Sequence, residues 1–217
     1  MNDRETTGGG SRLNRETTAS LVWRLDALLW LVVPGTIAGF LSDEALAAHW
    51  PDLASLGEIL GILCSVVYGL LLLNLAKVNG GYRAAGACTL FVAVAGIIIQ
   101  SLGGGDPRNV ERGIALILTF LSGVAALVGE CAECTSHAEV LEPVDMELSE
   151  KWRRLWKWYI GTYLGSVGSI VVVMIFGPLG LLVMLASIIG MMVVAILKLV
   201  YLWRTARTFR EYEEMEA

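Results

Sequence analysis

The chain has 217 residues, of which 55% are hydrophobic and only 17% are charged. A soluble domain of this length carries more charge and fewer apolar residues, so the composition indicates an integral membrane protein. No basic stretch is free of nearby acidic residues, which argues against nucleic-acid binding. The formal net charge of -5 does not predict orientation, because lysine and arginine decide it rather than acidic residues.

Residues 1–20 are polar and glycine-rich and show no apolar periodicity, so they predict a disordered cytoplasmic tail. The first apolar run, residues 21–41, is long enough to span a bilayer, and Pro34 within it predicts a kink. A cleaved signal peptide is the competing interpretation, because residues 45–47 are small enough for a cleavage site. We favour a retained helix, since the run is longer than the apolar segment of a signal peptide.

Five further apolar runs follow, at residues 53–76, 84–102, 113–129, 158–176 and 179–202. Each is near the ~20 residues that a helix needs to cross the hydrocarbon of a bilayer. Glycine, asparagine and proline mark turns between them. The sequence therefore predicts an all-α, polytopic helical membrane protein, with six transmembrane helices in one domain at residues 21–203.

The distribution of basic residues predicts the orientation of these helices. When alternate segments are assigned to the cytoplasm, every lysine and arginine except Arg108 and Arg112 lies on the inner side. Basic residues of multi-pass proteins accumulate on the cytoplasmic side. We therefore expect a cell-membrane protein with both termini in the cytoplasm. A helical cytoplasmic loop is predicted at residues 130–157, between helices 4 and 5, and a helical cytoplasmic tail at residues 204–217.

The predicted cytoplasmic loop begins with residue types that bind metals: Glu130, Cys131, Glu133, Cys134 and His137. On a helix, four of them lie along one face, and Cys131 lies one step around it. Thiolate, imidazole and carboxylate groups all bind zinc, so metal or redox sensing is one hypothesis. It is not favoured, because no second Cys/His pair lies at a characteristic distance and no thioredoxin-like pattern surrounds the cysteines. We expect no metal or other cofactor.

Ionisable residues inside the apolar runs are a second group of candidates. A charged side chain that faces lipid costs several kcal/mol, so each such residue suggests ion or proton transport. Arg24 and Glu58 lie close enough to the ends of their runs to reach headgroups or water. Asp26 is the better transport candidate because it precedes the predicted kink at Pro34. A pair with a neighbouring helix, or a shallow interfacial position, is nevertheless the favoured explanation of Asp26.

Small residues predict close packing of the last two predicted helices. They are Gly161, Gly165 and Gly168 on the fifth helix, and Ala186 and Gly190 on the sixth. Such small-xxx-small faces let helix backbones approach each other in a membrane. Because Gly177 and Pro178 allow only a very short connection, the two helices should form a tight antiparallel hairpin.

The function is less clear from the sequence than the fold. No HExxH, GxSxG or P-loop motif occurs, and no histidine lies in a predicted span, so we expect no enzyme activity. The leading hypothesis is an accessory, scaffold or self-assembling membrane protein whose partners are the lipid bilayer and either itself or another membrane protein. The alternative is a small transporter or channel that uses Asp26. Sensing through Cys131, Cys134 and His137 is the third hypothesis.

Overall fold

A computed structural model describes residues 15–42, 48–103 and 109–215 of the chain. All regular structure in these residues is helical: α1 (Arg15–Leu41), α3 (Pro51–Leu75), α4 (Gly81–Gly103), α5 (Asn109–Leu141), α6 (Met146–Phe176) and α7 (Pro178–Met215). The disordered tail predicted for residues 1–20 is wrong from Arg15 onward, where α1 begins, and residues 1–14 lie outside the described residues. The small residues 45–47 also lie outside them.

The fold class predicted from the sequence is confirmed. Among the described residues, five helical segments are long and apolar enough to cross a bilayer: Leu21–Leu41, Pro51–Leu75, Gly81–Leu102, Arg112–Leu141 and Gly180–Tyr212. The sixth predicted span, residues 158–176, is the second half of α6 and is not among these five. The chain is therefore a polytopic helical membrane protein, and the count of six spans stays a prediction.

The predicted loop at residues 130–157 consists of two helices and a tight turn. Helix α5 continues without a break to Leu141, and α6 begins at Met146. The side chain of Asp145 caps α6 by accepting a hydrogen bond of 2.9 Å from the Leu148 N–H group. The Ser149 hydroxyl then donates to the Ala138 carbonyl oxygen at 2.7 Å, which joins the two helices behind the turn. We call the end of the bundle that contains this turn the charged end.

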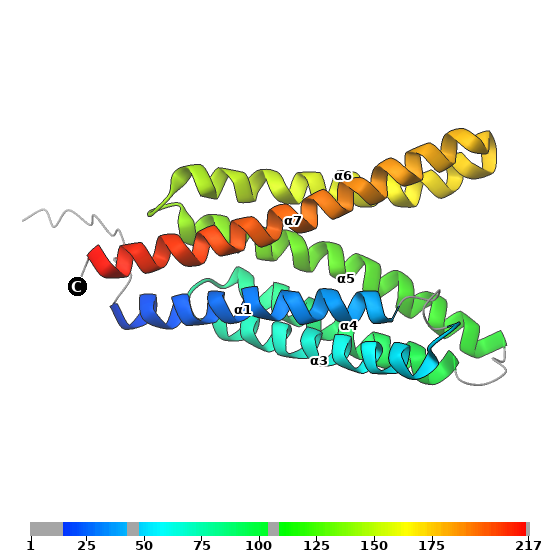
Figure 1. The fold of residues 1–217 in the computed structure, drawn as a ribbon, viewed down its shortest axis with the longest axis horizontal. Coiled ribbons are helices and arrows are strands. Elements are labelled where there is room, and N and C mark those ends of the chain that lie inside the picture. The colour runs from blue at the N-terminus through cyan, green and yellow to red at the C-terminus, as the bar shows by residue number, and fades with distance from the viewer. Residues whose placement is uncertain (1–14, 43–47, 104–108, 216–217) are drawn as a thin grey trace, which may run out of the picture.

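The contacts between the six helices of the described residues form a closed ring. Each helix makes its main contacts with the helices before and after it in the chain, and α7 also contacts α1. Helices α6 and α7 form a long antiparallel hairpin, and the C-terminal part of α7 lies beside α1 (Figure 1). This closure brings α7 opposite α3 and α5 across the interior of the ring.

The buried apolar core lies at the charged end. It combines side chains from all six helices, among them Leu25, Leu75, Tyr82, Leu141, Trp152, Leu202 and Phe209. Over the rest of the bundle many large apolar side chains are exposed, including Phe120 at 72% and Met174 at 84%. An apolar exterior of this extent fits a surface in contact with lipid.

The predicted α6–α7 hairpin forms, but its contact surface differs from the prediction. Gly177 turns the chain with φ = 51°, a left-handed conformation that favours glycine, and Pro178 starts α7 directly after it. A Cβ atom added at Gly165 would lie 2.9 Å from Ser187 Oγ, and one at Gly190 would lie 2.6 Å from Thr162 Cγ2. The helices therefore approach each other closely at these two glycines.

Gly161 and Gly168 do not belong to this contact surface, which corrects the prediction. A Cβ atom at either position would meet nothing within 4 Å. Ala186 is exposed as well. The close contact on α6 instead involves Thr162, Gly165 and Val173. Gly161 and Ala186 line an open groove between the two helices, beside this contact.

Candidate functional site

A cavity of about 690 Å³ lies inside the ring of helices. Its walls come from α1, α3, α4, α5 and α7, and α6 contributes Tyr159. Many wall residues are glycine or alanine: Gly35, Gly39, Gly57, Gly61, Ala93, Gly96, Ala125, Ala126, Gly129 and Ala195. Small side chains leave the space open, and the volume falls in the range of small-molecule binding sites.

Lys198 of α7 is the centre of a charged group in the wall of this cavity. Its ammonium nitrogen donates to both carboxylate oxygens of Glu130, at 2.7 and 2.9 Å, and lies 3.1 Å from Glu133 Oε1. The side chains are 19%, 26% and 3% exposed for Lys198, Glu130 and Glu133, respectively. All three residues lie within helical segments that are apolar enough to span a membrane.

Tyr68 of α3 completes the charged group from the opposite wall. Its hydroxyl donates a hydrogen bond to Glu133 Oε1. The Lys198 ammonium nitrogen lies 5.7 Å from the centroid of the Tyr68 ring, within the range of a cation–π contact. Helices α3, α5 and α7 are thus tied together by one group of polar contacts, which we call the Lys198 group: Tyr68, Glu130, Glu133 and Lys198.

A buried aromatic cluster supports the Lys198 group from the charged end. His137 Nδ1 and the Tyr82 hydroxyl share a hydrogen bond of 2.8 Å, and the imidazole stacks on Trp152 with the ring centroids 4.5 Å apart. Trp152 in turn donates to Thr205 Oγ1 at 3.0 Å. His137 Nε2 lies 3.7 Å from Glu133 Oε1, so the cluster is packed directly against that carboxylate.

The residue types that suggested a metal site are engaged in other contacts. Glu130 and Glu133 contact Lys198, and His137 contacts Tyr82. Cys134 is buried in the apolar core. Nowhere in the described part of the chain do three or more histidine, cysteine or acidic side chains lie where they could hold a metal ion. The five residues therefore do not form one ligand set along a helix face.

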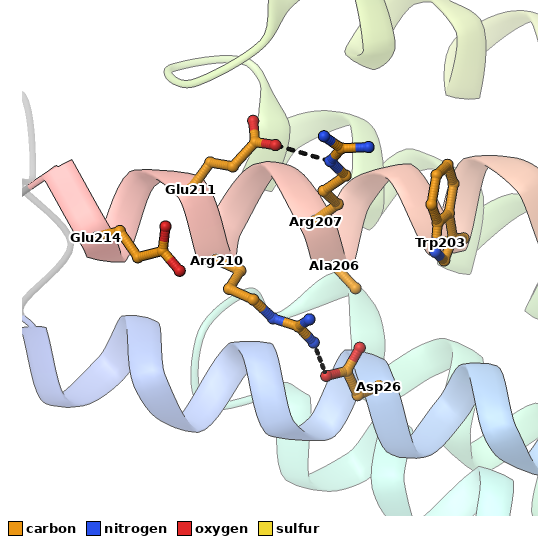
Figure 2. A pocket seen from close by; sticks show the side chains of 7 residues that line it. All are labelled: Asp26, Trp203, Ala206, Arg207, Arg210, Glu211 and Glu214. Atoms are coloured by element: carbon orange, nitrogen blue, oxygen red, sulfur yellow. Dashed lines mark hydrogen bonds and ion pairs between the residues drawn. The ribbon is translucent and has the colours of Figure 1, made fainter.

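Asp26 lies outside the large cavity. It accepts a hydrogen bond from Arg210 of α7 at the charged end, and Figure 2 shows the arginine reaching from one helix to the other. The pocket beside it is small, about 290 Å³, and is lined by Asp26 and residues of α7 only. The pair agrees with the interpretation that Asp26 joins neighbouring helices.

Glu58 does line the large cavity, on the same helix as Tyr68. Ten residues of helix separate the two positions, which corresponds to roughly 15 Å along the axis. Glu58 is therefore a second, separate carboxylate toward the other end of the cavity from the Lys198 group.

Lys198 is a candidate site residue that the sequence patterns did not single out. Lys198 lies in the apolar run at residues 179–202 and is the only charged residue of that run. That position was the available signal, because an ionisable residue within a span is a functional candidate by default. The tyrosines Tyr68 and Tyr159 gave no comparable signal, since their partners depend on how the helices are arranged.

Comparison with known proteins gives no relative from which a function could be inferred. No protein-family model, no curated protein and no solved structure matches the chain.

Proposed function

We propose that this chain is a non-enzymatic, multi-pass protein of the cell membrane that takes a small molecule into the cavity between its helices, as a carrier or transporter. The observation that carries this proposal is the Lys198 group in the wall of a cavity of about 690 Å³. This observation favours the transport hypothesis over the scaffold hypothesis. The residues that support transport are those of the Lys198 group and not Asp26, because Asp26 pairs with Arg210 outside the cavity.

Stability alone is a weak explanation for the Lys198 group. Removing charges from water costs several kcal/mol per ion, and apolar residues of similar volume often stabilise a fold as well as a buried ion pair does. Binding of a polar or charged ligand gives these charges a role that apolar side chains could not fill. The position of all four members of the group in the cavity wall supports this explanation.

We propose that the charged end faces the cytoplasm, with both termini on that side. The charged end carries Lys151, Arg153 and Arg154 in the first turns of α6, and Arg207 and Arg210 near the end of α7. This accumulation supports the orientation because basic residues of membrane proteins are enriched on the cytoplasmic side.

The scaffold hypothesis keeps support from one observation. Gly161 and Gly168 lie seven residues apart on α6, both are exposed, and a Cβ atom at either would meet nothing within 4 Å. Small residues at an open, lipid-facing surface allow a second helix to approach. A second copy of the chain or another membrane protein could therefore pack against this face.

A cavity-filling variant tests the proposed function. Gly96 lines the cavity, and a Cβ atom there would meet nothing within 4 Å, so Gly96→Leu should occupy the space without disturbing the backbone. Gly168→Leu is the matched control, because that position is equally open but lies outside the cavity. A panel of small amphipathic compounds of positive, negative and zero charge is added to the purified protein, and the melting temperature is measured.

We expect at least one class of compound to raise the melting temperature of the parent and of Gly168→Leu, but not that of Gly96→Leu, because a ligand stabilises only the state that binds it. If no compound distinguishes Gly96→Leu from the other two proteins, the proposed function is wrong.

A further inference from the structure

The charges that line the cavity do not balance. Its charged lining residues are Glu58, Glu130, Glu133 and Lys198, which are three carboxylates and one ammonium group. Lys198 can offset only one of the three negative charges. In surroundings of low dielectric constant, such an excess attracts a positive charge and repels a negative one.

Lys198 has no hydrogen-bonding capacity left for an anionic guest. An ammonium group has three N–H donors, and three carboxylate oxygens already lie within 3.1 Å of the Lys198 nitrogen. Glu130 differs, because each carboxylate can accept about four hydrogen bonds and its only described donor is Lys198. Glu130 is also the most exposed of the three side chains, at 26%. The part of the Lys198 group that is available to a ligand is therefore the negatively charged carboxylate of Glu130.

Aromatic side chains line the same cavity. Tyr68 already presents its ring to the ammonium group of Lys198, and Tyr159 of α6 also lines the wall. Aromatic rings attract ammonium groups, including quaternary ones that cannot donate hydrogen bonds. The pair of tyrosines therefore suits a positively charged group whether or not that group donates hydrogen bonds.

The remaining wall suits an apolar body. It is formed mainly by glycine, alanine and aliphatic side chains such as Leu31, Val92 and Leu199. Added Cβ atoms at Gly39 and Gly96 would meet nothing within 4 Å, so the space beside these two positions is unfilled. A molecule with an apolar part of several rings or branches could therefore fit next to the charged group.

From these observations we infer that the cavity binds an amphipathic cation, an ammonium or phosphonium group on an apolar body, with the charge against Glu130 and the body along the glycine-rich wall. This inference rests on the proposed function, because it names the class of molecule that the cavity takes. The same chemistry is present in a free lipophilic cation and in the ethanolamine headgroup of a lipid.

The test compares two ions of nearly equal size and opposite charge. The full-length protein in nanodiscs of an uncharged galactolipid, which has no ammonium group, is titrated with tetraphenylphosphonium and with tetraphenylborate. Binding is measured by calorimetry against empty nanodiscs of the same lipid. We expect saturable binding of the phosphonium ion and none of the borate ion. Glu130→Gln should weaken phosphonium binding by about tenfold or more, because it removes the charge that the cation faces.

Two further variants make the test independent of the charge change. Gly96→Leu should abolish phosphonium binding although it alters no charge, and Gly168→Leu should bind as the parent does. Glu147→Gln is the control for the loss of a carboxylate, because Glu147 lies outside the cavity and pairs with Lys151. Each variant is first shown to elute as a single species with a cooperative melting transition.

The outcomes separate this inference from the proposed function. Borate binding that Gly96→Leu abolishes would overturn the charge assignment and leave the proposed function intact. If neither ion binds the parent, this inference fails, and the proposed function is then decided by the uncharged compounds of the melting-temperature panel. If the phosphonium ion binds and ethanolamine lipid in the nanodisc competes with it, the natural ligand class includes a lipid headgroup. Phosphonium binding without such competition would indicate a free cation as the ligand class.

Discussion

The largest cluster of buried apolar side chains lies at the charged end of the bundle, whereas over the rest of it many large apolar side chains are exposed. Trp152 and Phe209 are 0% exposed, whereas Phe120 and Met174 lie open on the outer surface. The same residue types are buried in one region and exposed in the other because the hydrophobic effect buries apolar side chains only where the alternative is contact with water. Where lipid surrounds the helices, that force is absent and close packing has to hold them together.

Charged residues differ between the two regions as well. At the charged end they form exposed pairs within one turn of helix, such as Lys151 with Glu147 and Arg154 with Glu150. The hydrogen bond from Lys151 lowers the pKa of Glu147, but water screens such a pair and its contribution to stability is small. Inside the ring, the Lys198 group is enclosed by low-dielectric surroundings, so a single change there has a larger effect.

The largest effect is expected in the core of the charged end. Trp152→Ala would remove a fully buried ring that stacks on His137, and it would also remove the hydrogen bond to Thr205. We expect the free energy of unfolding to fall by about 3 to 5 kcal/mol, as for other large-to-small changes in water-packed cores. Chemical denaturation in mild detergent measures this loss.

Trp30→Ala is the matched control, because Trp30 is exposed on α1. It should change stability by less than about 1 kcal/mol. Equal losses for the two variants would mean that the charged end is not a water-driven core.

A somewhat smaller effect is expected at Lys198. Lys198→Met would leave Glu130 and Glu133 without their cationic partner, and we expect a loss of about 3 kcal/mol. Adding Glu130→Gln and Glu133→Gln to Lys198→Met should recover most of the loss, since the uncompensated charges are then gone. Unfolding in the same detergent tests this, and a triple variant as unstable as the single one would contradict the account of the Lys198 group.

Close packing in the lipid region predicts a still smaller effect. Gly165→Leu places a side chain where a Cβ atom would already lie 2.9 Å from Ser187 Oγ, so it should separate α6 from α7. The expected loss is about 1 to 3 kcal/mol, the usual result of overpacking. Gly168→Leu, three residues along the same helix, should change the melting temperature little because the position is open. Equal melting temperatures for Gly165→Leu and Gly168→Leu would refute the glycine contact.

The smallest effect is expected at Asp26. Its pair with Arg210 is partly exposed, at 31% and 56% for the two side chains, and such pairs contribute less than about 1 kcal/mol. Asp26→Asn should accordingly leave stability, and binding in the large cavity, close to those of the parent. Loss of ligand binding in Asp26→Asn, measured by calorimetry, would contradict this and indicate that Asp26 takes part in transport.

The fold was largely predictable because each apolar run is long, and length and composition decide whether a helix can span a bilayer. The rotation of each helix was not predictable to the same degree. Gly161, Gly165 and Gly168 all fit a small-residue face, and only packing against Ser187 of α7 selects Gly165 as the contact.

The candidate site was predictable only in part for a related reason. Glu130 and Glu133 were recognised as lying on one helix face, but their partners Lys198 and Tyr68 are 68 and 65 residues away in the chain. The closure of α7 onto α1 brings these residues together, and no local spacing in the sequence encodes that contact. The spacing of these carboxylates and His137 also fits a metal site, because local spacing does not show that Lys198 pairs with Glu130 and Glu133.

The position of a bound cation is the most direct test of the central claim that the Lys198 group and the glycine-rich wall form one binding site. Tetraphenylarsonium has the shape and charge of the phosphonium ion, and its arsenic atom can be located by anomalous X-ray scattering from crystals of the protein. The account predicts one arsenic peak inside the cavity, beside Glu130 and Tyr68, that is absent in Gly96→Leu. An ordered arsenic peak beside Asp26, or on the outer surface of the helices with the cavity empty, would contradict it.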